Sequence, residues 1–189
     1  MNDFSLWAQS ALQFPTMAVC VIDTTSIDKD AATTRVYVAT TTGVIYDQLL
    51  WSERHRTSNE QYTGIPEDTL LEMPTLPEEW EHIKATLTSH YLVAYNLDFV
   101  QQHLNENAEH YGLEPFYLIG ENLQENAVGY LRSIPGAYVS YGLKLVEACA
   151  RIGHTMPEHA AAPDRAAGQL ALLQALAEDA GDTVVDHPF

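Results

Sequence analysis

The sequence predicts an α/β fold in which helices flank a mixed five-stranded sheet. Three observations predict it: an apolar run near the N-terminus, two further strand patterns close behind it, and alternating helical and strand patterns over the remainder of the 189 residues. A meander of strands followed by such an alternation is typical of a layered α/β domain with a mixed sheet. A chain of this length forms one domain with short appendages. We expect an N-terminal arm over 1–16, one domain over 17–178 and an acidic tail over 179–189.

The first three strands are expected to form an antiparallel meander. Residues 17–23 (MAVCVID) are almost continuously apolar and rich in β-branched side chains, the pattern of a central strand buried on both faces. Residues 35–40 (RVYVAT) and 44–50 (VIYDQLL) flank Thr41, Thr42 and Gly43, which predicts a hairpin. The short helical pattern over 3–13 predicts an amphipathic arm ahead of this sheet.

Helices and strands alternate over the rest of the chain. Residues 77–89 (PEEWEHIKATLTS) have apolar residues at helical spacing, with Pro and two Glu residues in the first turn, as the start of a helix prefers. Residues 91–94 predict a strand, and 116–119 predict a fifth one. Further helices are expected over 97–110, 122–132, 141–152 and 163–178.

Composition excludes several classes of protein. The chain has 26 acidic and nine basic residues and a formal charge of −17, which argues against a polybasic binder of nucleic acid or membranes. A salt-adapted source would give the same balance. Cys20 and Cys149 are far apart and indicate neither a disulfide framework nor a zinc site. No apolar run reaches the length of a membrane span and no signal-peptide pattern opens the chain, so we expect a cytoplasmic protein without membrane contact.

Four segments of the chain occur in the order of a known family. They are the strand ending in Asp23, the turn 63–66 (TGIP), the strand-to-helix segment 94–100 (AYNLDFV), and 159–164 (HAAAPD), where His precedes Asp by five residues. In this order and spacing the chain resembles the DnaQ-like, DEDDh-type 3′–5′ exonucleases, which include the proofreading subunit of bacterial DNA polymerase III and ribonuclease T. The resemblance covers about residues 17–178 and implies a ribonuclease H-like fold.

The resemblance implies phosphodiester hydrolysis with two divalent ions. The family holds Mg²⁺ or Mn²⁺ about 3.5–4 Å apart with four carboxylates, because hard cations prefer oxygen ligands. By position, Asp23 matches the first acid and metal ligand, Asp164 the last acid and metal ligand, and His159 the general base. Another interpretation remains open for each of these residues: a turn acid at Asp23, a loop histidine at His159, and an acid in the first turn of a helix at Asp164.

Two of the four acidic positions are substituted. Thr25 stands where the family has Glu, and Val100 stands where it has Asp. Asp98 lies two residues before Val100 and should point roughly 200° away around the helix. Asp28 and Asp30 follow the first strand in a loop and would need a backbone path that the family does not use. We therefore expect at most one weakly held metal ion, and a site without any metal is the other outcome.

Six further residues are candidates for contact with nucleic acid. Gly64 and Ile65 resemble the family segment that contacts the terminal nucleotide, although a turn glycine beside a core isoleucine explains them equally well. Asn96 and Phe99 match the family's strand-to-helix segment, and we expect Asn96 to tie the strand to the helix and Phe99 to pack under the sheet.

The other two are Arg54 and Arg56, which with His55 form the one basic cluster in the sequence and are a candidate phosphate contact. A solvated surface loop is the other interpretation of this cluster.

The C-terminal residues offer a candidate contact with a partner protein. The end of the chain, DTVVDHPF, is similar to the acidic tip of bacterial single-stranded-DNA-binding proteins, with Asp186, Pro188 and Phe189 in the matching positions. That similarity implies docking to a replication or repair protein. A solvated acidic tail is the simpler interpretation.

Two hypotheses about function follow. The first is a degenerate exonuclease-fold module that binds a nucleic-acid end or a protein partner. The alternative is an active, metal-dependent 3′–5′ exonuclease acting on single-stranded DNA or RNA with atypical metal ligands. The substitutions at Thr25 and Val100 favour the first hypothesis.

Overall fold

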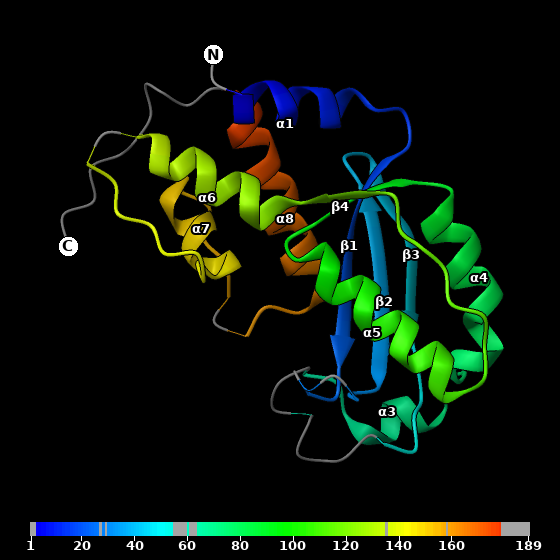
Figure 1. The fold of residues 1–189 in the computed structure, drawn as a ribbon. Helices are drawn as coiled ribbons and strands as arrows, with labels where there is room; N and C mark the ends of the chain where they lie inside the picture. Colours follow the sequence, from blue (N-terminus) through cyan, green and yellow to red (C-terminus); the bar gives the residue numbers. More distant parts are fainter. Residues whose placement is uncertain are drawn as a thin grey trace.

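The computed structural model describes residues 3–26, 28, 30–54, 60, 64–134, 136–157 and 159–178. A five-stranded sheet with the strand order β3-β2-β1-β4-β5 forms its centre (Figure 1). The strands are β1 (Met17–Thr24), β2 (Thr33–Thr40), β3 (Gly43–Leu49), β4 (Tyr91–Ala94) and β5 (Gly120–Asn122). The first three form an antiparallel meander, β4 pairs parallel with β1, and β5 pairs parallel with β4. The mixed sheet predicted from the sequence is confirmed.

Helices cover both faces of this sheet. Those in the described part of the chain are α1 (Asp3–Gln13), α3 (Glu67–Leu71), α4 (Leu76–Thr88), α5 (Leu97–His110), α6 (Leu123–Ser133), α7 (Leu145–Arg151) and α8 (Ala162–Ala177). None of the described helices is both long enough and apolar enough to span a bilayer.

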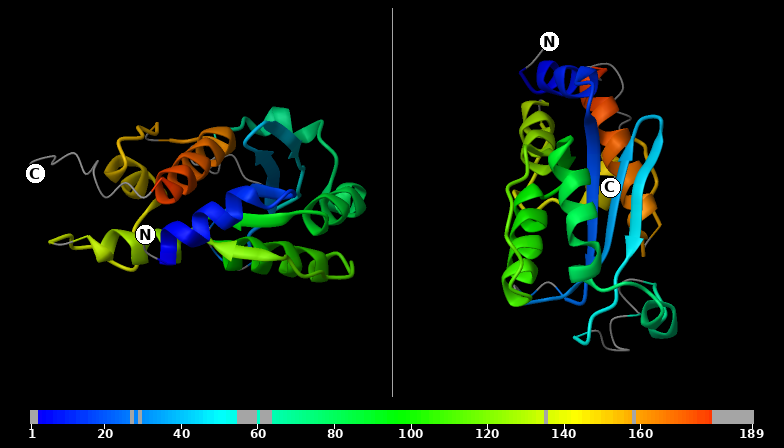
Figure 2. Two further views of the ribbon diagram at one scale, coloured as in Figure 1. Left: turned by 90° about the horizontal axis from the view of Figure 1, so that it is seen from above. Right: turned by 90° about the vertical axis from the view of Figure 1, so that its right-hand side faces the viewer.

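Alternation along β1 builds a core on each face. Val19 and Val21 belong to an apolar cluster shared with α1, α6 and α8, whereas Cys20 and Ile22 belong to a cluster shared with α4 and α5. Successive side chains of a strand point to opposite faces, so a strand that is apolar at every position must be covered twice. Helices α5 and α8 accordingly lie on opposite sides of the sheet (Figure 2).

Local side-chain contacts fix where the central helices begin. Glu78 accepts hydrogen bonds from the backbone N–H (2.7 Å) and the hydroxyl (2.8 Å) of Thr75 at the start of α4. Asn96 precedes α5, and its side-chain oxygen accepts a hydrogen bond from the Phe99 N–H at 2.9 Å. Such caps satisfy N–H groups that lack a partner within the first helical turn.

Two predicted elements were misplaced. The predicted strand over 116–119 is wrong: this stretch is irregular, and β5 begins only at Gly120, which pairs with Leu92. Phe116 instead packs against Trp80, with ring centroids 5.1 Å apart. The predicted helix over 141–152 starts late, because α7 begins at Leu145. Ahead of it residues 141–142 form a turn, and the Leu143 carbonyl accepts two side-chain hydrogen bonds from other elements.

The structure describes the predicted N-terminal arm from Asp3 onward and does not describe the predicted C-terminal tail. Within the predicted N-terminal arm, α1 buries Ala8 and Ala11 in the cluster beneath α8. The predicted tail over 179–189, including Asp186, Pro188 and Phe189, lies outside the described residues.

Gly120 gives a test of how β5 is placed. A Cβ atom at this position would collide with the backbone carbonyl of Leu92, so Gly120→Ala must push β5 away from β4. We expect a loss of about 2 kcal/mol in the free energy of unfolding, measured by urea denaturation. Gly142→Ala is the matched control, because a Cβ atom there meets nothing within 4 Å. Equal stability of the two variants would contradict this placement of β5.

Candidate functional site

The carboxylate of Asp23 lies where β1 ends, on the face of the sheet that α8 covers. Because side chains alternate between the two faces along a strand, Asp23 points to the same face as Val19 and Val21, which pack toward α8. Only 7% of the residue is exposed. An isolated carboxylate in such a place carries a large desolvation cost and needs a countercharge.

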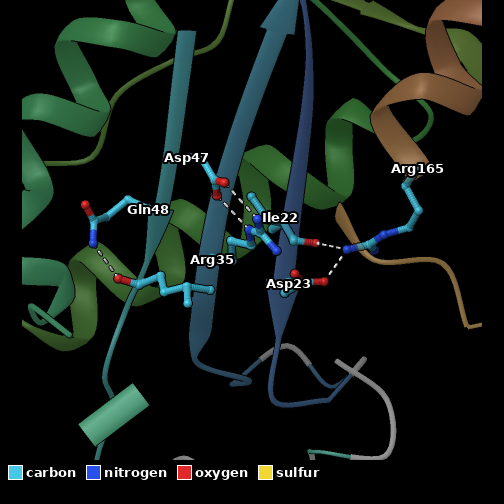
Figure 3. A network of polar contacts seen from close by, with 7 residues as sticks. Ile22, Asp23, Arg35, Asp47, Gln48 and Arg165 are labelled. Carbon is cyan, nitrogen blue, oxygen red and sulfur yellow. Dashed lines mark hydrogen bonds and ion pairs between the residues drawn. The ribbon is translucent and has the colours of Figure 1, made fainter. Parts of the chain in front are cut away.

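Arg165 supplies that countercharge from the first turn of α8. Its guanidinium donates to Asp23 Oδ1 and also approaches the Ile22 carbonyl oxygen at 3.5 Å (Figure 3). The Arg165 side chain is 31% exposed, so the pair has one buried and one partly solvated member. Asp23 Oδ2 is buried without a hydrogen-bond partner among the described residues.

Burial dominates the acidity of this carboxyl group. Desolvation raises the pKa of Asp23 above its ordinary value, and the charges of Arg165 and then Arg35 oppose the rise without cancelling it. The ionised carboxylate at neutral pH is therefore a net cost to folding that Arg165 reduces.

A second ion pair extends this contact across the sheet. Arg35 is the cross-strand neighbour of Asp23 in the register of β1 and β2. It donates to Asp47 on β3 through Nε (2.7 Å) and Nη2 (2.8 Å). Two acids and two guanidinium groups thus alternate from the edge strand to α8, with no surplus of negative charge (Figure 3).

Thr25 and Val100, at the two positions where the resemblance leads us to expect acids, both have structural contacts. The Thr25 hydroxyl accepts a hydrogen bond from the Ala32 N–H at 3.0 Å and so closes the connection between β1 and β2. Val100 is 4% exposed and belongs to the cluster between α5 and the sheet, together with Leu97 and Leu104. Neither residue offers an anionic ligand.

Asp164 and His159 do not join Asp23 in a metal-binding group. Asp164 Oδ2 accepts a hydrogen bond from the Ala161 N–H at 3.2 Å and so caps α8. Consecutive helical residues point about 100° apart, so Arg165 can reach Asp23 while Asp164 turns back to the helix end. His159 is exposed.

The other acids near these positions also have local partners. Asp28 accepts from the Ser26 hydroxyl at 3.0 Å, and Asp98 accepts from Asn122 Nδ2 at 2.9 Å. The exposed Asp30 contributes its backbone carbonyl, and not its carboxylate, to a contact with Arg54.

These residues do not fit a pair of Mg²⁺ or Mn²⁺ ions. Such ions need several oxygen ligands apiece, largely carboxylates. Within the described ranges, no group of three or more His, Cys, Asp and Glu side chains is arranged to hold a metal ion. The one buried acid of the predicted site, Asp23, instead faces a guanidinium group.

The candidate nucleic-acid contacts belong to several elements and connections of the fold. Asn96 caps α5, as expected. Phe99 is partly buried against the apolar cluster between α5 and the sheet, as expected, and its ring is tilted against that of His103 with centroids 4.1 Å apart. Gly64 is exposed with φ +67°, a backbone conformation that favours glycine, and Ile65 is buried.

Arg54 is tied into the protein by two contacts. Its Nη1 donates to the Asp30 carbonyl at 2.6 Å and its Nη2 to Asn107 Oδ1 at 2.8 Å. It borders an open hollow of about 470 Å³ that is also lined by Asp30, Glu106, Asn107, Glu109 and His110. Three acids line this hollow, so it is a poor site for a phosphate. Arg56 lies outside the described residues.

Sequence reasoning missed Arg165, which is the central residue of this site. Its signal was nevertheless present: a buried strand-end acid requires a cation, and Arg165 directly follows Asp164 in a chain with nine basic residues. The pair Arg35–Asp47 was missed too, because its register depends on a shift in the pairing of β2 with β3.

Comparisons with known proteins find the same fold among nucleases. No family model and no curated protein matches the sequence. Among solved structures, the nuclease domain of 3′hExo bound to rAMP, described as a DEDDh family member, has 14% identity and a TM-score of 0.65, covering 87% of this chain and 93% of that one. A 3′-exonuclease that recognises a histone mRNA stem-loop has 13% identity and a TM-score of 0.66, covering 87% of this chain and 64% of that one.

A third comparison extends the fold to a larger bacterial enzyme. Escherichia coli exonuclease I in complex with a dT13 oligonucleotide has 11% identity and a TM-score of 0.68, covering 86% of this chain and 41% of that one. Apart from the isolated nuclease domain, the chain thus spans less than two thirds of the length of these structures. The predicted DnaQ-like, ribonuclease H-like exonuclease fold is confirmed.

The pair Asp23–Arg165 predicts a pH-dependent loss of stability in Arg165→Met. Without the guanidinium, the folded-state pKa of Asp23 rises further above its unfolded value of about 3.9. A carboxyl group whose pKa is raised in the folded state stabilises the fold at acid pH, and this contribution is lost as the pH rises. The free energy of unfolding of Arg165→Met should therefore be lowest, relative to wild type, at neutral pH. We expect a deficit of roughly 2 kcal/mol at neutral pH, below the range for fully buried pairs because Arg165 is partly solvated.

Urea denaturation of Arg165→Met at neutral pH and at mildly acid pH measures this deficit. Asp23→Asn combined with Arg165→Met is the control, because it removes the buried charge and should recover most of the lost stability. A deficit of Arg165→Met that does not change with pH would show that Asp23 is not the group left unpaired.

Proposed function

We propose that this chain has the DEDDh exonuclease fold without hydrolytic activity and serves as a binding module for a nucleic-acid end or a protein partner. The observation that carries the proposal is the ion pair between Asp23 and Arg165. In the family that the sequence resembles, the matching acid is a metal ligand. Here its charge is already neutralised by a residue of the protein itself.

Electrostatics support the loss of the metal pair. Two divalent cations a few ångströms apart repel each other strongly, and the surrounding carboxylates must offset that repulsion. At the four acidic positions this chain keeps Asp23 and Asp164 and has Thr25 and Val100 in place of the others. Asp23 is bound to Arg165 and Asp164 caps its own helix. Binding of a cation would first require Arg165 to leave Asp23.

Binding of nucleic acid agrees with what the structural neighbours contact. Their structures include one bound to rAMP, one that recognises an mRNA stem-loop and one with a dT13 oligonucleotide. A fold without metal chemistry can keep such a surface, since binding and hydrolysis depend on different groups. Docking of Asp186, Pro188 and Phe189 to a partner protein, and a cytoplasmic location, stay predictions from the sequence.

The alternative is an active exonuclease with Mg²⁺ or Mn²⁺ held by groups that replace the missing acids. An assay on end-labelled single-stranded DNA and RNA with either metal separates the two. We expect wild type and Asp23→Ala to leave both substrates intact to the same extent. Degradation by wild type that Asp23→Ala abolishes would contradict the proposal.

A gain-of-function variant tests in the same assay whether activity can be restored. Thr25→Glu, Val100→Asp and Arg165→Ala together restore the missing carboxylates and remove the competing cation. We expect metal-dependent shortening of single strands by this variant alone. Because Val100 is buried, circular dichroism must first show that the variant folds. Thr25→Glu with Val100→Asp, keeping Arg165, is the matched control and should leave the strands intact.

A further inference from the structure

The segment 136–144, which connects α6 to α7, presents two tyrosines to solvent. Tyr138 is 87% exposed and Tyr141 is 81% exposed. The aliphatic side chains of Val139 and Leu143 point inward and belong to the apolar cluster on the α8 face. The exposed remainder consists of glycines, Ser140 and Lys144. We call residues 136–144 the tyrosine segment.

Hydrogen bonds from neighbouring elements hold the backbone of the tyrosine segment. Arg132 Nε donates to the Val139 carbonyl at 2.9 Å, and Arg151 Nη2 donates to the Tyr138 carbonyl at 3.3 Å. The Leu143 carbonyl accepts from the Tyr95 hydroxyl at 2.7 Å and from Gln124 Nε2 at 2.8 Å. The rings therefore project from an ordered backbone, which lowers the entropy lost when a ligand binds.

Two arginines contact the tyrosine segment although the chain as a whole is strongly acidic. The Arg132 guanidinium carbon lies 3.6 Å from the centroid of the Tyr141 ring. Four of the nine Lys and Arg residues fall between Arg132 and Arg165, where the acids are Glu147, Glu158 and Asp164, against a formal charge of −17 for the chain. With Arg165 bound to Asp23, the cations left for a ligand are Arg132, Lys144 and Arg151.

We propose that the tyrosine segment binds single-stranded nucleic acid, with bases stacked on Tyr138 and Tyr141 and phosphates at Arg132, Lys144 and Arg151. Exposed aromatic faces beside cations are how sequence-tolerant single-strand binders hold their ligand. A protein interface would place apolar side chains at the centre of the patch, whereas the aliphatic residues of this segment are turned inward. The inference rests on the proposed binding function and names its ligand and its surface.

Fluorescence anisotropy with labelled oligothymidylate and oligouridylate tests the proposal on the full chain, in EDTA so that no hydrolysis occurs. We expect Tyr138→Ala and Tyr141→Ala each to weaken binding about tenfold. Tyr138→Phe and Tyr141→Phe keep the rings and should bind like wild type. Tyr117→Ala is the matched control, because Tyr117 is 84% exposed but lies in the connection before β5, outside the tyrosine segment, and should leave binding unchanged.

The salt dependence supplies a second readout. Three phosphate contacts predict a slope of about −2 for the logarithm of the binding constant against the logarithm of salt concentration, and Lys144→Gln should reduce its magnitude by about 0.7. No binding of either oligonucleotide, or binding that the alanine variants leave unchanged, overturns the proposal. Metal-dependent hydrolysis by wild type together with tyrosine-dependent binding in EDTA would overturn the proposed loss of activity and support this surface.

Discussion

The buried carboxylate of Asp23 is the constraint on which this arrangement depends. A strand that is apolar at every position except its end can be covered on both faces, but the covering removes that last side chain from water. Its negative charge must then be met by a cation that belongs to the fold or binds to it. Here the cation is the guanidinium of Arg165, which comes from the first turn of α8. The contact that neutralises the charge also fixes the start of α8 against β1.

The same charge links distant parts of the sheet. Asp47 on the edge strand holds Arg35, Arg35 lies opposite Asp23, and Asp23 holds Arg165 (Figure 3). Each acid has a guanidinium neighbour, so the chain of contacts is neutral. A cluster built for divalent cations has the opposite character, since it gathers carboxylates whose repulsion only the metal relieves. The alternation of charge therefore supports the proposed loss of hydrolysis independently of the substitutions at Thr25 and Val100.

Much of the fold could be predicted from the sequence, because its elements have strong local signals. The apolar run of β1, the cap at Asn96 and the first turn of α4 each specify their element within a few residues. The fifth strand could not be placed, because the apolar residues near Phe116 pack around Trp80, while β5 is defined by backbone pairing at Gly120. At the site, Thr25 and Val100 could be identified from the sequence, because each is a single position in a motif that the resemblance locates. The role of Arg165 could not be predicted, because it depends on how α8 docks on the sheet.

The formal charge of −17 is compatible with binding of nucleic acid because the charge is unevenly distributed. Salt screens exposed charges beyond roughly 8–10 Å, so a bound strand responds chiefly to the groups that it touches. Around the tyrosine segment those groups are Arg132, Lys144 and Arg151, and the Arg132 guanidinium lies over the Tyr141 ring. The acidic remainder slows the approach of a polyanion and weakens contacts elsewhere on the protein. Both effects favour the tyrosine segment as the place where the proposed single strand would bind, because stacking there adds an attraction that does not depend on net charge.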